Sequence, residues 1–283
     1  VDDEQALPEA FAMVRSQITE IDAVCSRFRS DSELSRLNRS AGSGAFELHP
    51  LLEEAIAAAL RVAEMTDGLV DPTIGRHVED AGYTVTFSAI PKEGPPLELR
   101  IRHVVGWRAV DLDRGSHTAC LPAGAALDLG ASGKAWAADR AADAVASSLG
   151  VGVLVDCGGD VSVRGRVPGQ GWPVRVASDV GAPDGQDVLV RDGGLATSGT
   201  TSRRWRRGGA EIHDIIDPRT GLPAETPWAM VTVAAATCLE ANAASTAALI
   251  MGEEARPWLN ACRLPARLVR SNGRVELAGG WCS

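Results

Sequence analysis

A glycine-rich turn at residues 127–134 carries residue types that suit an anionic ligand. Its letters are LDLGASGK, so an apolar run passes through two glycines and reaches Lys134. Backbone N–H groups at a turn that opens a helix lack partners within the helix and can bind a phosphate, to which a lysine adds positive charge. The stretch is not a Walker loop, because Asp128 and Ala135 stand where that loop requires Gly and Ser or Thr. The sequence therefore allows two interpretations of this stretch, a phosphate-binding turn and a purely structural turn.

A second polar concentration lies where a predicted strand runs into an Asp-Pro turn, at residues 212–223 (IHDIIDPRTGLP). Such a turn needs no function. Site residues nevertheless often collect at strand ends, and a histidine or carboxylate there can act as a general base. The polar residues of this stretch are His213, Asp214, Asp217 and Thr220. A Ser198–His213–Asp217 hydrolase triad is disfavoured, because Ser198 lacks the G-x-S-x-G surroundings of a nucleophile elbow.

Other stretches allow either a ligand site or a purely structural role. Residues 156–160 (DCGGD) and 196–199 (ATSG) place glycines between apolar runs, which favours tight turns over ligand cradles. The basic run at residues 203–207 (RRWRR) favours a solvated loop over a phosphate clamp. Asn242 and Thr246 lie four residues apart in a predicted helix and so share one face. If that face is buried, their oxygen atoms can bind a hard cation.

Apolar periodicity predicts the elements that position these stretches. Spacings of three and four residues predict helices at residues 11–28, 51–66, 134–149 and 239–251, with loops at 30–44 and 69–96. The first helix is predicted to have one apolar face formed by Phe11, Val14, Ile18, Ile21, Cys25 and Phe28. Strands are predicted at residues 98–105, 108–113, 117–121, 125–129, 151–156, 160–165, 173–177, 187–190, 211–216, 230–235, 267–269 and 275–277. Clusters of mostly antiparallel strands separated by single helices indicate an α+β fold.

Composition excludes several classes of protein. The 283 residues are 45% hydrophobic and 23% charged, which is ordinary for a soluble globular chain. The net charge of −9 disfavours nucleic acid as a partner, because phosphate binding needs a basic surface. No apolar run reaches the roughly 18 residues needed to span a bilayer, and no signal peptide is visible. The six cysteines form no C-x-x-C pair. We therefore expect a reduced protein of the cytoplasm. If an upstream signal has been removed, we expect a membrane-anchored extracytoplasmic protein instead.

Taken in order, these motifs resemble the ApbE family, the FAD:protein FMN transferases. Residues 25–38 (CSRFRSDSELSRLN) are similar to its first signature, and residues 67–73 (DGLVDPT) are similar to the second. The glycine and Asp-Pro stretches described above and residues 240–246 (EANAAST) complete a match from residue 20 to residue 252. Each motif alone is weak, whereas their common order is specific. The first strand of the family, with a Met-Gly-Thr signature, is expected upstream of Val1.

The resemblance implies one ApbE-like domain over residues 1–283, a monomer with two closely packed lobes and FAD bound in the cleft between them. Phe28 is then expected to lie against the flavin nucleotide, with Thr220 near the cofactor. Pocket and cofactor contacts are expected from Leu69, Val70, Asp71, Asp128 and Lys134. A Mg²⁺ ion is expected on the backbone carbonyl of Ala131 and on the side chains of Asn242 and Thr246.

The activity implied by the resemblance is transfer of FMN from FAD to a threonine hydroxyl of an acceptor flavoprotein, with release of AMP. Two alternatives remain: an FAD-binding or flavin-carrying protein without transfer, and an FAD pyrophosphatase that gives FMN and AMP. The chain departs from the family at two positions. Asn242 replaces an aspartate, and Asp214 stands where a histidine is usual, with His213 one residue earlier. Because one step along a strand reverses the direction of a side chain, His213 and Asp214 are both candidates for the catalytic base.

Overall fold

The computed structural model describes residues 1–96, 103–177 and 185–282. Its helices are α1 (Leu7–Cys25), α2 (Glu33–Arg39), α3 (Pro50–Met65), α4 (Gly75–Asp80), α5 (Gly133–Leu149), α6 (Cys238–Met251) and α7 (Ala255–Cys262). Short 3₁₀ turns are η1 (Glu4–Ala6), η2 (Phe87–Ala89), η3 (Trp107–Ala109) and η4 (Gly252–Glu254). The strands are β1 (Phe46–Glu47), β2 (Glu93–Gly94), β3 (Asp111–Asp113), β4 (Thr118–Cys120), β5 (Val153–Asp156), β6 (Asp160–Arg164), β7 (Trp172–Val176), β8 (Gln186–Val190), β9 (Gly193–Gly199), β10 (Arg204–Arg207), β11 (Ala210–His213), β12 (Ile216–Asp217), β13 (Leu222–Pro223), β14 (Trp228–Ala235), β15 (Ala266–Arg270) and β16 (Val275–Ala278).

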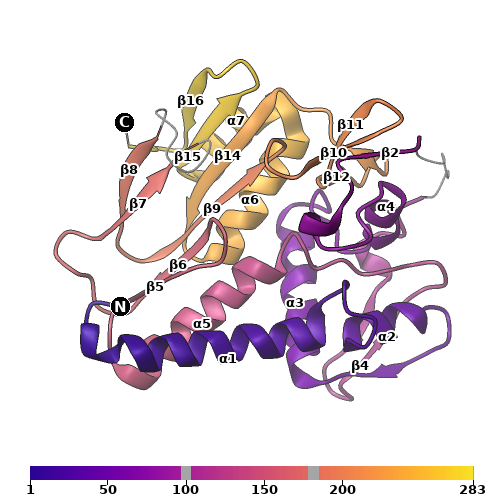
Figure 1. Cartoon of the computed structure of the whole chain (residues 1–283), viewed down its shortest axis with the longest axis horizontal. Helices are drawn as coiled ribbons and strands as arrows, with labels where there is room; N and C mark the ends of the chain where they lie inside the picture. The colour runs from indigo at the N-terminus through magenta and orange to yellow at the C-terminus, as the bar shows by residue number, and fades with distance from the viewer. Residues whose placement is uncertain (97–102, 178–184, 283) are drawn as a thin grey trace.

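A six-stranded antiparallel sheet forms one half of the molecule, in the order β16-β15-β14-β9-β6-β5 (Figure 1). Helices α5 and α6 pack on one face of this sheet, and α1 lies along α5. The β7–β8 hairpin contributes to the apolar cluster on the other face, around Val161, Val163 and Leu195. The period of two in β6 explains this layering, because its polar residues Asp160 and Ser162 alternate with the two valines.

The other half is built around α3, for which apolar spacing predicts an inward face of Leu52, Ile56, Ala59, Leu60 and Ala63. Leu60 is half-buried and the other four are buried. Helix α2 and the three-stranded sheet β1-β4-β3 share a core with α3. A second small sheet, β11-β10-β2, packs with α4. Among the strand pairs of the described residues only β10–β2 is parallel. The mixed helices and largely antiparallel sheets confirm the predicted α+β class.

Small residues allow the two main helices to approach each other and the sheet. Ala138, Ala141 and Ala142 of α5 are fully buried. A Cβ atom on Gly194 of β9 would lie 2.1 Å from the backbone nitrogen of Cys238, so only glycine permits the N-terminus of α6 to sit on this strand. Helix α6 is buried on nearly all sides, which explains why it lacks an amphipathic pattern.

Two side chains hold the N-terminus of α6 in place. The hydroxyl of Thr237 accepts a hydrogen bond from the backbone N–H of Glu240, at 3.1 Å. The carboxylate of Asp139 on α5 accepts hydrogen bonds from the N–H groups of Cys238 (3.0 Å) and Leu239 (2.9 Å). These contacts satisfy N–H groups that a helix start leaves without partners. They fix α6 relative to α5, and with it the positions of the polar residues that α6 carries.

We expect Thr237→Ala to lower the free energy of unfolding by about 1 kcal/mol, because the substitution removes the N-cap acceptor of α6. Urea denaturation monitored by circular dichroism measures the change. Thr201→Ala, at an exposed position, is the control and should leave the denaturation midpoint in place. A midpoint that is equal in both variants would show that Asp139 alone caps the helix.

Several predicted elements differ from the structure. Residues 196–199, predicted as a turn, belong to the central strand β9, which pairs with β14 and β6. The predicted loops at residues 30–44 and 69–96 contain α2 and α4. Residues 125–129 form no strand, because their pairing is limited to one isolated bridge between Ile74 and Ala126. Their position is instead fixed by hydrogen bonds to Asn38 of α2, to Pro72 and to Gly75 at the start of α4.

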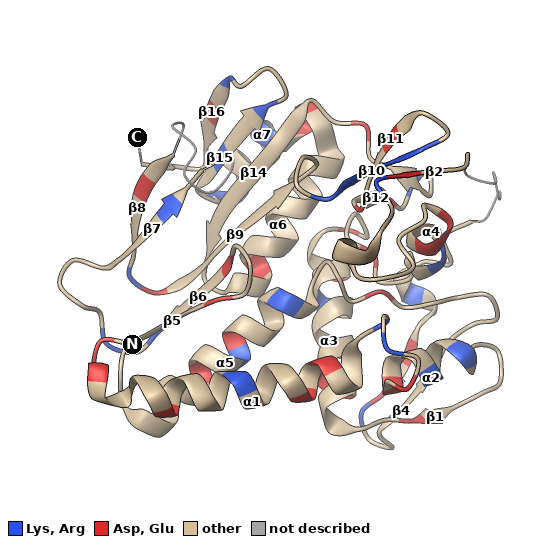
Figure 2. Cartoon of the chain, in the orientation of Figure 1, with Lys and Arg blue, Asp and Glu red and all other residues tan. Residues whose placement is uncertain are grey.

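Other predictions were partly right. The predicted strand at residues 211–216 is interrupted between β11 and β12, and residues 98–102 of another predicted strand lie outside the described residues. The basic run was interpreted wrongly as a solvated loop, since residues 204–207 form β10 between β11 and β2. Acidic residues of both neighbouring strands lie beside the basic strand (Figure 2), since Arg206 pairs in register with Glu211 of β11 and with Glu93 of β2. In α1, Phe11 is 64% exposed and therefore lies outside the predicted buried face.

Candidate functional site

A cavity of about 740 Å³ opens among elements from both halves of the chain. Such a volume is typical of small-molecule sites, which span about 300–1,000 Å³. Its walls come from α1, the segments before α4 and α5, the β5–β6 turn, β9, the segment between β11 and β12, and α6. The predicted site residues that line it are Phe28, Leu69, Val70, Asp71, Asp128, Ala131, Lys134, Asp214, Asn242 and Thr246. His213 and Thr220 are not among the lining residues.

Helix α1 supplies an apolar wall of this cavity. Val14, Ile18, Ile21 and Cys25 recur on one face of the helix and line the cavity. The predicted period of α1 is therefore confirmed for these residues, although they border a ligand-sized volume instead of a closed core. The helix ends at Cys25, so Phe28 follows it in a turn and reaches the cavity from there.

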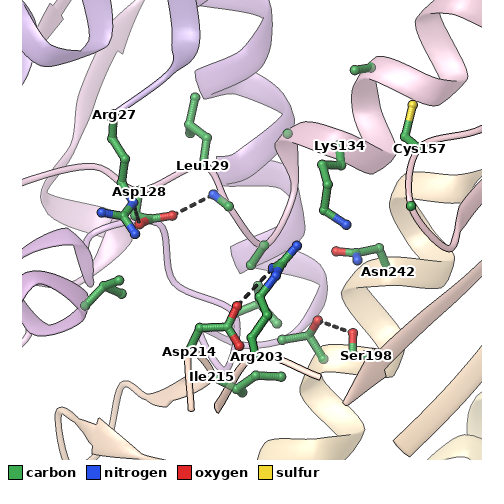
Figure 3. Close-up of a pocket in the computed structure, with 18 of the residues that line it drawn as sticks. Arg27, Asp128, Leu129, Lys134, Cys157, Ser198, Arg203, Asp214, Ile215 and Asn242 are labelled. Atoms are coloured by element: carbon green, nitrogen blue, oxygen red, sulfur yellow. Dashed lines mark hydrogen bonds and ion pairs between the residues drawn. The ribbon is translucent and has the colours of Figure 1, made fainter. Parts of the chain in front are cut away.

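Two short contacts fix the side chain of Asp128 at the start of the glycine-rich turn. Its Oδ2 atom lies 2.6 Å from Nε of Arg27, and its Oδ1 atom accepts a hydrogen bond from the backbone N–H of Gly130 at 2.6 Å. The Arg27 guanidinium stacks on Phe28, with 4.1 Å to the ring centroid, and on Tyr83, with 4.5 Å. This arrangement links the carboxylate to an aromatic wall, and Phe28, Tyr83 and Asp128 all line the cavity. Figure 3 shows Arg27 beside Asp128.

Asn38 fixes the position of the backbone at the same turn. Its amide donates to the carbonyl of Leu127 at 2.9 Å and accepts from the N–H of Leu127 at 2.8 Å. A backbone N–H of the neighbouring residue, Asp128, donates to the carbonyl of Pro72 at 2.8 Å. These bonds join three segments distant in sequence. They replace the ladder bonds that the predicted strand at residues 125–129 would have made.

Asp71 is buried and its carboxylate is occupied by protein donors. Oδ1 accepts hydrogen bonds from the backbone N–H and the hydroxyl of Thr73, at 2.8 and 2.7 Å. Oδ2 accepts from the backbone N–H of Trp107 at 2.9 Å. The carboxylate therefore stabilises the loop that brings Leu69 and Val70 to the cavity wall.

The N-terminus of α5 forms a positive edge of the cavity. The cap residue Ser132 makes no side-chain capping bond, so its side chain does not cover the N–H groups at the helix start. Lys134 follows in the first turn, and its Nζ atom lies 2.5 Å from Oδ2 of Asp160. A helix start and an ammonium group together favour a phosphate at this edge.

Oxygen atoms gather on the α6 side of the cavity. Oδ1 of Asn242 is buried and has no hydrogen-bond partner among the described residues, while its Nδ2 donates to Oδ1 of Asp160 at 3.2 Å. The hydroxyl of Thr246 lies 2.8 Å from that of Ser198, which is also 2.8 Å from that of Ser245. An unpartnered buried carbonyl oxygen is costly unless a ligand or ion satisfies it.

His213 and Asp214 are neighbours in the sequence, but their side chains lie in different environments. Asp214 lines the cavity, where its Oδ2 lies 2.9 Å from Nη1 of Arg203 (Figure 3). The His213 ring faces elsewhere: Nε2 donates to the carbonyl of Ala224 at 3.1 Å, and Nδ1 accepts from the N–H of Ile215 at 3.3 Å. Burial lowers the pKa of His213, which favours the neutral ring. The structure therefore gives Asp214, not His213, access to a ligand.

Thr220 lies in the exposed turn between β12 and β13. Its hydroxyl donates to the carbonyl of Asp217 at 3.3 Å, and its predicted role near the cofactor stays a prediction. The hydrolase triad is excluded by the same geometry, because Asp217 pairs with Arg219 at 2.7 Å and Ser198 bonds to hydroxyl groups. His213 joins neither of them.

Sequence reasoning missed three charged residues of the site. Arg27 lay inside a quoted signature, and Arg203 was grouped with the basic run, although it pairs with Asp214 inside the cavity. Asp160, only 1% exposed, followed the two glycines of the β5–β6 turn and was assigned no role. An aspartate that opens a strand directly after Gly158 and Gly159 is a weak signal. Its partners, Lys134 and Asn242, could not be found from spacing.

Comparison with known proteins decides the relationship. The family model described as the ApbE family matches residues 3–268. The chain belongs to the ApbE family. The FAD:protein FMN transferase of Treponema pallidum is 33% identical over 266 residues, covering 88% of this chain and 72% of the relative. The FAD:protein FMN transferase of Salmonella typhimurium is 27% identical over 259 residues, covering 89% and 74%.

Solved ApbE structures share the fold. The ApbE protein from Thermotoga maritima superposes with a TM-score of 0.82 at 26% identity, over 96% of this chain and 89% of that one. The Pseudomonas stutzeri flavinyl transferase ApbE, in its apo form, gives a TM-score of 0.80 at 24% identity, over 96% and 87%. The resemblance inferred from ordered motifs and the ApbE-like fold are thereby confirmed. Within the part of the chain that the structure describes, no helix is long and apolar enough to cross a membrane.

Proposed function

We propose that this ApbE-family chain is an FAD:protein FMN transferase that moves FMN from FAD to a threonine hydroxyl of an acceptor flavoprotein and releases AMP. The names of its relatives support this activity. The observation that carries the proposal is one cavity shared by Asp128, by Lys134 at the start of α5, and by Asn242, whose buried oxygen has no partner among the described residues. Groups for a nucleotide, a phosphate and a cation thus face a single volume.

A divalent cation fits the charge of this volume. The lining side chains include five carboxylates and three cationic groups, so a diphosphate would meet a net negative wall. No cluster of three or more His, Cys, Asp or Glu side chains capable of holding a metal occurs among residues 1–96, 103–177 and 185–282. The ligands we propose for Mg²⁺ are instead the carbonyl of Ala131, Oδ1 of Asn242 and the hydroxyl of Thr246. Hard oxygen donors of this type suit Mg²⁺.

Residues of this chain would bind FAD and remove the proton of the acceptor hydroxyl. The α5 N-terminus and Lys134 hold the diphosphate, and Phe28 faces the flavin nucleotide. The acceptor hydroxyl forms a bond to the FMN phosphorus as the bond from that phosphorus to the AMP oxygen breaks. The hydroxyl proton passes to Asp214, the carboxylate that faces the cavity. A bound Mg²⁺ supplies charge neutralisation on the diphosphate, which makes AMP a better leaving group.

One observation favours the alternative of an FAD-binding protein without transfer. The only imidazole of the Asp-Pro stretch, His213, is turned to Ala224, and Asp214 is engaged by Arg203. Arg203 holds one carboxylate oxygen of Asp214, so transfer requires the other oxygen to reach the acceptor hydroxyl, or the pair to separate when FAD and the acceptor enter. If neither occurs, the same cavity binds FAD and performs no chemistry.

Incubation with FAD, Mg²⁺ and an acceptor flavoprotein domain tests the proposal. We expect the acceptor to gain the mass of FMN, with one AMP released for each label, and the Thr→Ala acceptor to stay unlabelled. Removal of Mg²⁺ with EDTA should abolish labelling. Retention of intact FAD with no label would support the flavin carrier. Free FMN and AMP without acceptor labelling would support the pyrophosphatase. Either of these results contradicts transfer.

A further inference from the structure

A buried carboxylate lies directly behind the cavity wall. Asp160 opens β6 and is only 1% exposed. Its two oxygen atoms divide between two side chains of the cavity: Oδ2 lies 2.5 Å from Nζ of Lys134, and Oδ1 accepts from Nδ2 of Asn242 at 3.2 Å. Asp160 itself is not among the residues that line the cavity. One carboxylate therefore contacts both the amine and the amide that face a ligand.

The contact with Asp160 determines which end of the Asn242 amide faces the cavity. A carboxylate only accepts hydrogen bonds, so the amide must turn its NH₂ group toward Asp160. Its oxygen then points the other way, where it is buried and has no partner in the described part of the chain. An asparagine without such a neighbour could equally present its NH₂ group, which repels a cation.

The same carboxylate limits the charge that Lys134 offers to a phosphate. The Lys134 side chain is 39% exposed and belongs to the first turn of α5, so its ammonium group can reach the cavity. While it is paired with Asp160 at 2.5 Å, part of its positive charge is compensated. Loss of the carboxylate would free the ammonium for a phosphate, and at the same time would release the amide of Asn242.

We propose that Asp160 is a positioning residue that turns the carbonyl oxygen of Asn242 into the cavity as a cation ligand and restrains Lys134 beside the diphosphate. This inference rests on the proposed function, because it assumes that FAD and a divalent cation share the cavity. It predicts opposite effects on the two ligands when Asp160 loses its charge. A residue with a purely structural role would change the binding of both in the same direction.

The test compares Asp160→Asn with the native full chain. Asparagine keeps the volume of the side chain but can turn an NH₂ group toward Asn242. We expect the affinity for Mg²⁺, titrated calorimetrically into the FAD-loaded protein, to fall at least about tenfold, which corresponds to about 1.4 kcal/mol. We expect the affinity for FAD without Mg²⁺, measured by flavin fluorescence, to be unchanged or higher because Lys134 is released.

The exchange variant Asp160→Asn with Asn242→Asp keeps the hydrogen bond between the two positions but moves the carboxylate to the cavity. It should restore Mg²⁺ affinity to the native value or above. A fall in both affinities together with a lower melting temperature, without rescue in the exchange variant, would overturn the inference. So would Mg²⁺ affinity within twofold of native in Asp160→Asn, or no Mg²⁺ binding by the native protein.

These results are separable from a failure of the proposed function. If native protein binds FAD and Mg²⁺ and Asp160→Asn shows the opposite effects, the positioning role stands even when no acceptor is labelled. If the acceptor is labelled but Asp160→Asn binds Mg²⁺ as the native chain does, the transferase assignment stands and the role of Asp160 is refuted. Binding and labelling are therefore measured on the same preparations.

Discussion

Asp214→Asn is expected to slow FMN transfer by about 100-fold or more, the effect typical of losing a general base. The amide has the size of the carboxylate and still lines the cavity, but it cannot take the proton of the acceptor hydroxyl. FAD affinity should not fall, because Arg203 loses its anionic partner and becomes free for a phosphate. Single-turnover labelling of the acceptor measures the rate, and flavin fluorescence measures the affinity.

His213→Gln is the matched control for this variant. Its ring bonds to Ala224 and Ile215, outside the cavity, so the transfer rate should stay within about threefold of native. The reverse result, with transfer lost in His213→Gln and kept in Asp214→Asn, would assign the base to His213. That outcome would require the segment between β11 and β12 to reverse its two side chains when FAD binds.

Lys134→Met is expected to weaken FAD binding by about 10- to 100-fold, since a hydrogen bond to a charged group contributes about 1.5–3 kcal/mol. The methionine keeps the length of the side chain and removes the ammonium at the start of α5. It also leaves the buried carboxylate of Asp160 without its cation, so the free energy of unfolding should fall. Flavin fluorescence titration and urea denaturation measure the two effects.

The sequence contains only one other lysine, Lys92, which makes a convenient control. Lys92→Met changes an exposed residue beside β2 and should alter neither FAD affinity nor stability. Lys134→Arg keeps the charge and should recover a large part of the affinity. Equal FAD affinity in Lys134→Met and native protein would remove Lys134 from the ligand site.

Local pattern predicted the four longest helices, α1, α3, α5 and α6, and most strands, because these elements follow the apolar spacing of neighbouring residues. The face of α3 and the period of α1 follow directly from apolar spacing. The same pattern failed for β9, whose three glycines and one alanine have low strand propensity. That strand forms because β14 and β6 pair with it on both sides, a tertiary effect that overrides propensity.

The candidate site, like the fold, was predicted from the sequence only in part. Ordered motifs indicated Asp128, Lys134 and Asn242, which share one cavity. Lys134 and Asn242 lie on the predicted helices α5 and α6, whereas Asp128 lies on a segment that was wrongly predicted as a strand. The one-residue step between His213 and Asp214 also predicted that the two side chains face different ways. The pairing of Asp160 with a helix 82 residues away left no trace in local spacing.

The residues that line the cavity are far apart in the sequence, which affects when the cavity forms during folding. The wall includes Val14 near one end and Ile250 near the other, and Asn38 closes onto Leu127 across 89 residues. We expect such distant closures to be completed late in folding, because each must overcome a loop entropy that grows with the length of the loop. A partly folded intermediate would therefore lack the cavity, and a ligand that fills it would stabilise the fully folded state alone.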